Sequence, residues 1–593
     1  MKIKLPQELI GTVFQKLFPV EMNTFSVEML LPSLFFLIES KGRQRRKKAD
    51  SEIIDEYLSD FQDHKRLQGF SDINGKRLLE KWVKTSLMVI GKKGKKRVEN
   101  QILYLQPLTY LTFKAGFPST LSRLRNVHYF IYRLMIDALK EQGEQKAYLI
   151  VRSALRQAFA EGINNLPEGD APGIEIDGVY DGQTKLDTET LLATLFMDIF
   201  SPSQTGLPLK SEAQAPVCEG QAKRFMQGFI KFIKVFKDRM PARELIYNLQ
   251  TLINFELCIY TLKLIYGTNY LVKTGDIPAQ FTLDILPTKP EIYVDVTDNQ
   301  KCFSREIARQ CVSRDLQEFA QFFTSNLKLR SMDYFANNCP VLKNMLAGNQ
   351  GREYFRVLNS LTDDNDIQAD ARSAINRIRN KNKKETDETD EMLEEFFSRC
   401  DNLYPDDSLS RLVMILDEAQ RNSRGGKMIQ WFKDVGGVEK NYGFIKGSSK
   451  HRNTWAYSMS NDLLWALIHL ASINPSETGH DNFRPKRIRL AEFLEFLEKW
   501  YGIIINRVPE GMESISNHRS ARENLSALQK RLKQMGLFDN LSDDFEAQYI
   551  KPQYREVLKP KILKRLGISL EQYIRPQYRE VLKAGQCHRN NWG

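Results

Sequence analysis

The chain has 593 residues, of which 42% are hydrophobic and 10% aromatic. Such a composition supplies apolar side chains for several cores of roughly 100–200 residues each, and it excludes global disorder. The 86 Lys and Arg outnumber the 74 Asp and Glu, which gives a formal net charge of +12. Where these cations cluster, they favour an acidic partner such as nucleic acid.

The cysteine and hydropathy patterns indicate a cytoplasmic protein. The seven cysteines are widely spaced and never form CxxC, and the seven histidines show no paired Cys/His spacing. We therefore expect a reducing compartment, no disulfide framework, no metal site and no cofactor. The N-terminus lacks a signal-peptide pattern, and the longest apolar runs are too short to cross a bilayer, so no membrane association is predicted.

Residues 1–165 are predicted to form an N-terminal helical domain with two basic loops. Apolar residues recur at three- and four-residue spacing in Lys76–Ile90 and Leu121–Glu161, for example. Each loop follows an apolar segment that we interpret as a helix, and two such loops could meet one phosphate backbone. Their cations are Lys41, Arg43, Arg45, Arg46, Lys47 and Lys48 in the first loop, and Lys92, Lys93, Lys95, Lys96 and Arg97 in the second.

The middle of the chain divides by composition. Gly, Pro, Asp and Ser mark 166–217 as a loop or linker region, and 218–360 is predicted to be a central helical domain. A charged linker at 361–395 has a basic half followed by an acidic half, which we expect to pair locally. A further helical domain is predicted for 396–480.

Residues 481–545 resemble a winged-helix pattern. Two amphipathic helices are predicted, and Gly536 has the position of a helix-ending glycine after the second. Such a domain often places one helix in a DNA groove, whereas the alternative is a plain helical hairpin in the core. The candidate phosphate contacts of this region are Arg484, Lys486, Arg487, Arg489, Lys530, Arg531 and Lys533.

The last segment, 546–593, is a duplicated basic tail. Gln548–Lys559 and Gln572–Lys583 are identical at eleven of twelve positions. Two copies are too few for a solenoid, so a tandem duplication is the simplest interpretation.

Catalytic motifs are incomplete. No GxxxxGK[ST] phosphate-binding loop is present. Arg123 and His128 form an RxxxxH spacing that resembles helical ribonucleases, in which the histidine acts as acid or base. Acidic residues with a nearby lysine offer the residue types of a metal-dependent nuclease. These two sets are Asp177, Asp181 and Lys185, and Glu291, Asp295 and Lys301.

Three stretches carry a resemblance to known proteins: Leu30–Lys48, Leu105–Val127 and Phe493–Asp544. They are similar to large non-catalytic proteins of bacterial antiphage systems that are tied to DNA modification, such as methylation-associated defence and phosphorothioation-dependent restriction. The resemblance implies partner subunits that supply ATPase, methyltransferase or nuclease activity.

The sequence therefore predicts a mainly α, multi-domain protein of helical bundles, with a C-terminal winged-helix-like domain and minor β segments. Its predicted function is that of a DNA-binding accessory subunit of an antiphage complex, without catalysis of its own. Two alternatives stay open: a nuclease of the helical or metal-dependent type, and a pure protein scaffold whose basic patches meet acidic partners.

Overall fold

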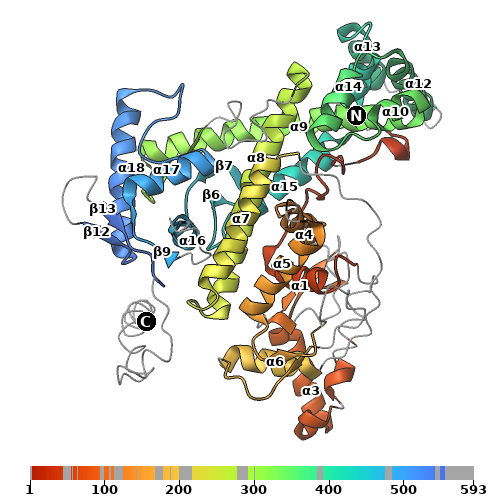
Figure 1. Ribbon diagram of the computed structural model, residues 1–593. Helices are drawn as coiled ribbons and strands as arrows, with labels where there is room; N and C mark the ends of the chain where they lie inside the picture. Colours follow the sequence, from red (N-terminus) through yellow and green to blue (C-terminus); the bar gives the residue numbers. More distant parts are fainter. Residues whose placement is uncertain are drawn as a thin grey trace.

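The computed structural model describes residues 3–11, 13–43, 55, 58–62, 64–93, 99–105, 109–111, 124–139, 141, 143–166, 178–186, 188–199, 217–276, 291–299, 301–383, 391–474, 484–540 and 548–554. Within this part the protein is mainly helical, as predicted, and its strands are short (Figure 1).

Three helices form the centre of the N-terminal part. α1 (Leu30–Glu39) packs against α4 (Val127–Asp137) and α5 (Glu144–Phe159), while α3 (Ile73–Trp82) and α6 (Thr188–Ile199) lie further out (Figure 1). Glu39 at the end of α1 is fully buried, and it accepts hydrogen bonds from Tyr110 and from Arg156 of α5. A buried carboxylate needs such partners, so these contacts fix the end of α1 just before the first basic cluster.

The prediction of one helix from Lys76 through Ile90 was wrong. The α-helix ends at Trp82, a π-helical turn covers Val83–Leu87, and β1 (Met88–Lys93) pairs antiparallel with β2 (Glu99–Leu105). Met88-Val89-Ile90-Gly91 contains two β-branched residues and a glycine, which favour a strand over a helix. A second small hairpin joins β3 (Ile163–Asn164) to β4 (Val179–Tyr180).

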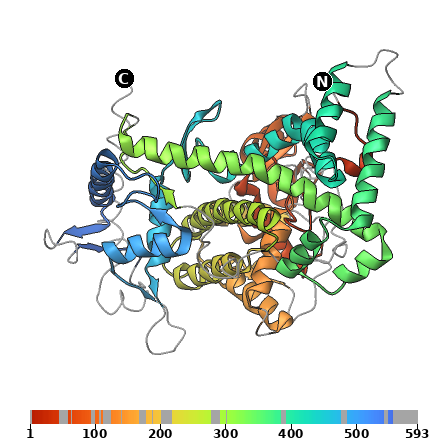
Figure 2. The same ribbon diagram turned by 90° about the horizontal axis from the view of Figure 1, so that it is seen from above.

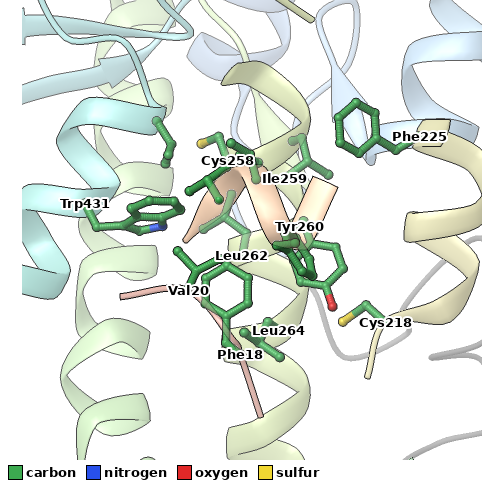
Figure 3. Packing of buried hydrophobic residues seen from close by; sticks show 14 of the residues in the cluster. Phe18, Val20, Cys218, Phe225, Cys258, Ile259, Tyr260, Leu262, Leu264 and Trp431 are labelled. Atoms are coloured by element: carbon green, nitrogen blue, oxygen red, sulfur yellow. The ribbon is translucent and has the colours of Figure 1, made fainter. Parts of the chain in front are cut away.

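Three long helices organise the middle of the molecule: α7 (Glu219–Phe236), α8 (Ala242–Thr274) and α9 (Phe303–Asn338). Almost every residue of α8 between Leu245 and Leu271 is buried, so this helix runs through the core. Figure 3 shows Tyr260 of α8 beside Phe18, with ring centroids 5.8 Å apart, and Trp431 lies on the other side of Phe18 at 6.0 Å. The N-terminal segment is thus part of the central core.

Helices α10 to α14 surround the C-terminal half of α9 (Figures 1 and 2). A π-helical turn at Arg421–Gly425 joins α14 to α15 (Gly426–Val435), and the junction contains the glycine pair Gly425 and Gly426. Lys383 and Glu394, from the two halves of the charged segment, are 3.8 Å apart, as local pairing predicts. The bounds are Pro340–Leu346 for α10, Gly351–Ser360 for α11, Asn365–Lys383 for α12, Glu391–Leu403 for α13 and Ser408–Gln420 for α14.

The C-terminal part alternates helices and short strands. A hairpin of β6 (Ile445–Ser448) and β7 (His451–Tyr457) packs on α9, and α16 (Asn461–Ala471) packs on α8. The later elements are β8 (Ile473–Asn474), β9 (Arg484–Pro485), β10 (Ile488–Arg489), α17 (Leu490–Tyr501), β11 (Ile503–Ile504), α18 (Ile515–Gln534), β12 (Phe538–Asn540) and β13 (Gln548–Ile550).

Pairing between distant strands ties this part to the rest. β11 runs parallel to β5 (Ile292–Tyr293), and β10, β13 and β12 form a three-stranded antiparallel sheet in that order. One hydrophobic cluster connects residues from Ile3 to Ile550. The division into separate domains stays a prediction. None of the helices in the described residues combines the length and hydropathy that a bilayer-spanning helix needs.

Candidate nucleic-acid interface

The outer face of α18 carries a stripe of cations, which we call the α18 stripe. Its cations are Arg519, Arg522, Lys530 and Lys533, with Ser526 between them, and all five residues are exposed. Their spacings of three and four residues place them on one side of the helix. The opposite side buries Ala521, Leu528 and Leu532 against the body of the protein, as expected of an amphipathic helix. At the edge of the stripe, Glu523 pairs with Arg519 at 3.1 Å.

The side chain of Asn524 holds α18 in place. Its amide donates to the carbonyl oxygens of Val294 (2.8 Å) and Ile505 (3.0 Å), and its Oδ1 accepts from the backbone N–H of Val296 (2.9 Å). Asn524 is fully buried, and these three bonds satisfy its polar atoms in the interior. The helix is thereby fixed to the segments that directly follow β5 and β11.

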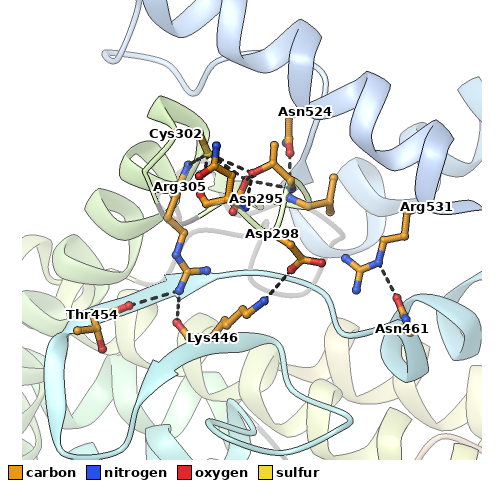
Figure 4. Close-up of polar contacts among 12 residues, drawn as sticks. Asp295, Asp298, Cys302, Arg305, Lys446, Thr454, Asn461, Asn524 and Arg531 are labelled. Atoms are coloured by element: carbon orange, nitrogen blue, oxygen red, sulfur yellow. Dashed lines mark hydrogen bonds and ion pairs between the residues drawn. The ribbon is translucent and has the colours of Figure 1, made fainter. Parts of the chain in front are cut away.

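Figure 4 shows the loop at residues 295–302 between α18 and the β6–β7 hairpin. The buried carboxylate of Asp295 accepts from the Thr297 hydroxyl and the Ser304 hydroxyl, both at 2.8 Å. Asp298 accepts from Lys446 of β6 at 2.7 Å. These contacts join the loop to the start of α9 and to β6, and residue 300 within it lies outside the described residues.

Arg531 proves to be a structural contact. Its Nε donates to Asn461 of α16 at 2.6 Å, and the side chain points toward the 295–302 loop and away from the α18 stripe (Figure 4). Lys533 instead lies 5.7 Å from the ring centroid of Phe538, and Lys530 is exposed. Of these three predicted contacts, Lys530 and Lys533 belong to the stripe.

The cations before α17 lie near the three-stranded sheet. Lys486, Arg487 and Arg489 are exposed, and the Arg487 guanidinium lies 5.4 Å from the ring centroid of Tyr549 in β13. Arg489 also begins α17, where its backbone N–H donates to Glu492 at 2.9 Å. Arg484 is in β9, which pairs with β8.

The first two clusters are elsewhere. Lys41 and Arg43 follow α1, and the Lys41 ammonium lies 5.6 Å from the ring centroid of Tyr148 in α5. Lys92 and Lys93 end β1, and they are not at a helix end as predicted. Figure 1 shows α7 and α8 between α1 and α18, so Lys41 and Arg43 at the end of α1 follow a helix on the other side of these two helices from α18. Arg45, Arg46, Lys47, Lys48, Lys95, Lys96 and Arg97 lie outside the described residues.

Two of the candidate catalytic residues that the structure describes, His128 and Asp181, have their contacts within the fold. His128 is buried in α4, and burial lowers its pKa from 6.5 to about 3, so its ring is neutral near pH 7 and a poor proton donor. Its predicted partner Arg123 lies outside the described residues, as does Asp177. Asp181 accepts from the N–H groups of Gln183 and Thr184 in a turn.

In the second acidic set, Glu291, Asp295 and Lys301, both carboxylates contact other residues of the fold. Glu291 pairs with Arg507, and Asp295 holds the 295–302 loop. Lys301 lies at the end of that loop, where its backbone N–H donates to Asn299 Oδ1 at 3.0 Å. These contacts favour a structural role for Glu291 and Asp295, and the nuclease alternative stays a prediction.

Comparison with protein families identifies the chain. The model of the family "Methylation-associated defense system protein MAD7" matches residues 10–554. The chain belongs to this family. No curated protein matches it. The match covers the helical body and the C-terminal strands through β13, and it places the protein in a methylation-associated antiphage defense system, which implies further proteins of that system.

Family membership sharpens the resemblance seen in the sequence. Of the two kinds of system suggested, the match supports methylation-associated defense. The sequence analysis did not single out Arg519 and Arg522. A signal was available, because helical spacing places both on the same side as Lys530 and opposite the apolar Leu528 and Leu532. It also missed the β6–β7 hairpin, because this hairpin lies in the region 396–480 that is predicted to be a helical domain.

Proposed function

We propose that this member of the family is a DNA-binding accessory subunit of its defense system, and that the α18 stripe contacts the duplex. The observation that carries the proposal is the exposed cationic stripe on a helix whose other face is anchored in the core. An exposed helix of this kind fits the major groove, which is wide enough to admit an α-helix.

The topology around α18 supports a winged-helix arrangement. Apart from β8, β9 and β11, which pair outside this sheet, the elements follow the order α16, β10, α17, α18, β12 and β13, and β13 pairs between β10 and β12. In this arrangement the third helix is the recognition helix, and the strands after it form a wing. α18 holds the place of the third helix, and β12 with β13 holds the place of the wing strands.

The salt dependence of duplex binding tests the proposal. Each phosphate that a cation neutralises releases counterions, so binding weakens as salt rises. Arg522 and Lys530 are exposed on α18, and reversing both to Glu replaces attraction by repulsion without disturbing the buried face. We expect the R522E/K530E variant to bind a duplex about 10-fold or more weakly, with a shallower dependence on salt.

The measurement is fluorescence anisotropy of a labelled duplex across a salt series. The charge-matched control is K343E/R372E, because Lys343 of α10 and Arg372 of α12 are exposed on helices at the far end of α9 (Figure 1). Equal affinity and equal salt slope for the α18 variant and the control would contradict the proposal. Circular dichroism verifies that both variants fold.

The first basic cluster stays a proposal of a separate phosphate contact. Reversal of Arg43, Arg45, Arg46, Lys47 and Lys48 to Glu is expected to lower DNA affinity and to flatten its salt dependence. The same anisotropy titration measures it. Binding equal to that of the unaltered protein would remove these residues from the interface while leaving the α18 stripe unaffected.

The partners are proposed on the same basis. A subunit that binds DNA without a complete catalytic motif needs other proteins for chemistry, and we propose an ATPase, methyltransferase or nuclease of the same system. The scaffold alternative differs in one observable: its cations would meet acidic protein surfaces, and the protein would purify with partners but without affinity for a duplex.

A further inference from the structure

A second basic element lies across the 295–302 loop from α18. We propose that the β6–β7 hairpin is a β-ribbon arm that contacts the phosphodiester backbone of the duplex, together with a cationic pocket at the start of α9. This inference rests on the proposed function and extends it to a second contact site that the sequence did not indicate.

The hairpin has the form of an arm. The first four residues of β7, His451–Thr454, are exposed, whereas Trp455, Ala456 and Tyr457 are buried. Trp455 links the two strands, because its indole N–H donates at 2.8 Å to the carbonyl of Ser448, the last residue before the turn. Figure 2 shows this blue-green hairpin standing out beside α9. A two-stranded ribbon of this kind is one of the two elements that the major groove admits.

Two arginines of α9 hold the arm in position. Arg305 donates from Nη2 to the Lys446 carbonyl at 2.7 Å, and also to the Thr454 carbonyl at 3.4 Å (Figure 4). Arg309 donates from Nη1 to the Asn453 carbonyl at 3.4 Å. Because both strands are clamped to a 36-residue helix, the arm is fixed before any ligand binds, which lowers the ordering cost of an interface.

The tip of the arm presents cations. Lys450, His451 and Arg452 are consecutive and exposed. The turn is kept in shape by Glu439, whose carboxylate accepts from the Ser449 N–H at 2.8 Å. Lysine and arginine side chains on a fixed backbone are the usual contacts to phosphate oxygens.

A pocket adjoins the base of the arm. It has a volume of about 620 Å³ and is lined by Lys301, Phe303, Arg305, Arg309, Ser448 and Thr454, together with Cys302 and Glu306. Three cations and one carboxylate give it a positive balance, and Glu306 is paired with Arg309 at 2.8 Å. Phe303 is 63% exposed, so the pocket offers both charge and an apolar side chain to a nucleotide.

The arm and the α18 stripe are held relative to each other by the loop between them. Asp298 of the loop pairs with Lys446 of the arm at 2.7 Å, and Asn524 of α18 is hydrogen-bonded to Val294, just before the loop, and to Val296 within it. Two cationic elements that are both hydrogen-bonded to the segment 294–298 suit a ligand that is itself rigid and repeats its charge. We therefore favour a duplex over a flexible acidic peptide.

The test compares four forms of the full chain: unaltered, K450E/R452E, R522E/K530E and the K343E/R372E control. Each is titrated with a labelled duplex of 24 base pairs over a salt series. We expect the K450E/R452E arm variant to bind about 10-fold more weakly than the control, with a salt slope reduced by roughly two contacts.

The outcomes separate the two proposals. Arm-variant affinity and slope equal to the control, with the R522E/K530E variant weakened, would overturn the arm and leave the proposed function standing. The reverse pattern would keep the arm and remove the α18 stripe. No duplex binding by the unaltered protein would overturn both.

A crosslinking experiment identifies the ligand at the arm directly. A photoreactive benzoylphenylalanine at position 451 is expected to crosslink to the duplex, whereas the same group at position 343 is not. Excess unlabelled duplex should remove the crosslink, and polyglutamate of equal charge should not. Equal competition by polyglutamate would assign the arm to an acidic protein and overturn the inference.

Discussion

Replacement of Asn524 by Leu is expected to lower the free energy of unfolding by about 3–6 kcal/mol. Leucine has a similar size but leaves two buried carbonyl oxygens and one buried N–H without partners, and each such group costs about 1–3 kcal/mol. The groups belong to Val294 and Val296, which follow β5, and to Ile505, which follows β11. Because the amide anchors α18, we also expect the variant to lose duplex affinity.

Urea denaturation followed by circular dichroism measures the effect. Asn524→Asp tests the mechanism, since a carboxylate can still accept from the Val296 N–H but cannot donate to the two carbonyls, so it should be destabilised as well. Ser526→Ala is the matched control, because Ser526 is exposed on the same helix and its change should stay within about 0.5 kcal/mol. Asn524→Leu as stable as this control would contradict the anchoring role.

A second large effect is expected from the buried polar cluster between α7, α8 and α17. The carboxylate of Glu256 accepts from the Tyr501 hydroxyl and the Gln221 amide, both at 2.7 Å, and Lys263 contacts the other end of the Gln221 amide. Burial raises the pKa of Glu256 from 4.5 to about 7, against the opposing effect of its hydrogen bonds. Burial likewise lowers the pKa of Lys263 from 10.5 to about 8.

The sign of the pH dependence follows from proton binding. Between pH 4.5 and 7 the folded protein holds the Glu256 proton more tightly than the unfolded chain, so this group stabilises the fold at low pH. That stabilisation, about 3 kcal/mol for a pKa difference of this size, is lost as pH rises through 7. Lys263 acts in the opposite direction: its contribution is present above pH 10.5 and is lost as pH falls through 8.

Glu256→Gln removes the first titration. We expect the stability difference between the unaltered protein and this variant to change by about 3 kcal/mol between pH 4.5 and 7.5, as measured by urea unfolding at several pH values. Glu495→Gln on α17 serves as the control, because its carboxylate is 58% exposed. A pH-independent difference for Glu256→Gln would show that the carboxyl keeps an ordinary affinity for its proton.

Prediction from sequence was most successful where structure is local. The apolar spacing of 490–500 and 520–535 matches α17 and α18, and Gly536 ends the second helix with a positive φ of 70°. It was least successful at 76–90 and 445–457, where strands form. The predicted phosphate contacts stay a prediction: Lys530 and Lys533 are exposed on α18, while Arg531 donates a hydrogen bond to Asn461.

The amino-acid sequence by itself determined the helices, their buried faces and the cationic character of the chain. Helical hydrogen bonds join residues four apart, so the pattern within one segment is enough to specify them. The tertiary structure decided which strands pair and which cations share a surface. β5 with β11 and β10 with β13 join distant segments, and such partners are chosen only when the whole core forms around them.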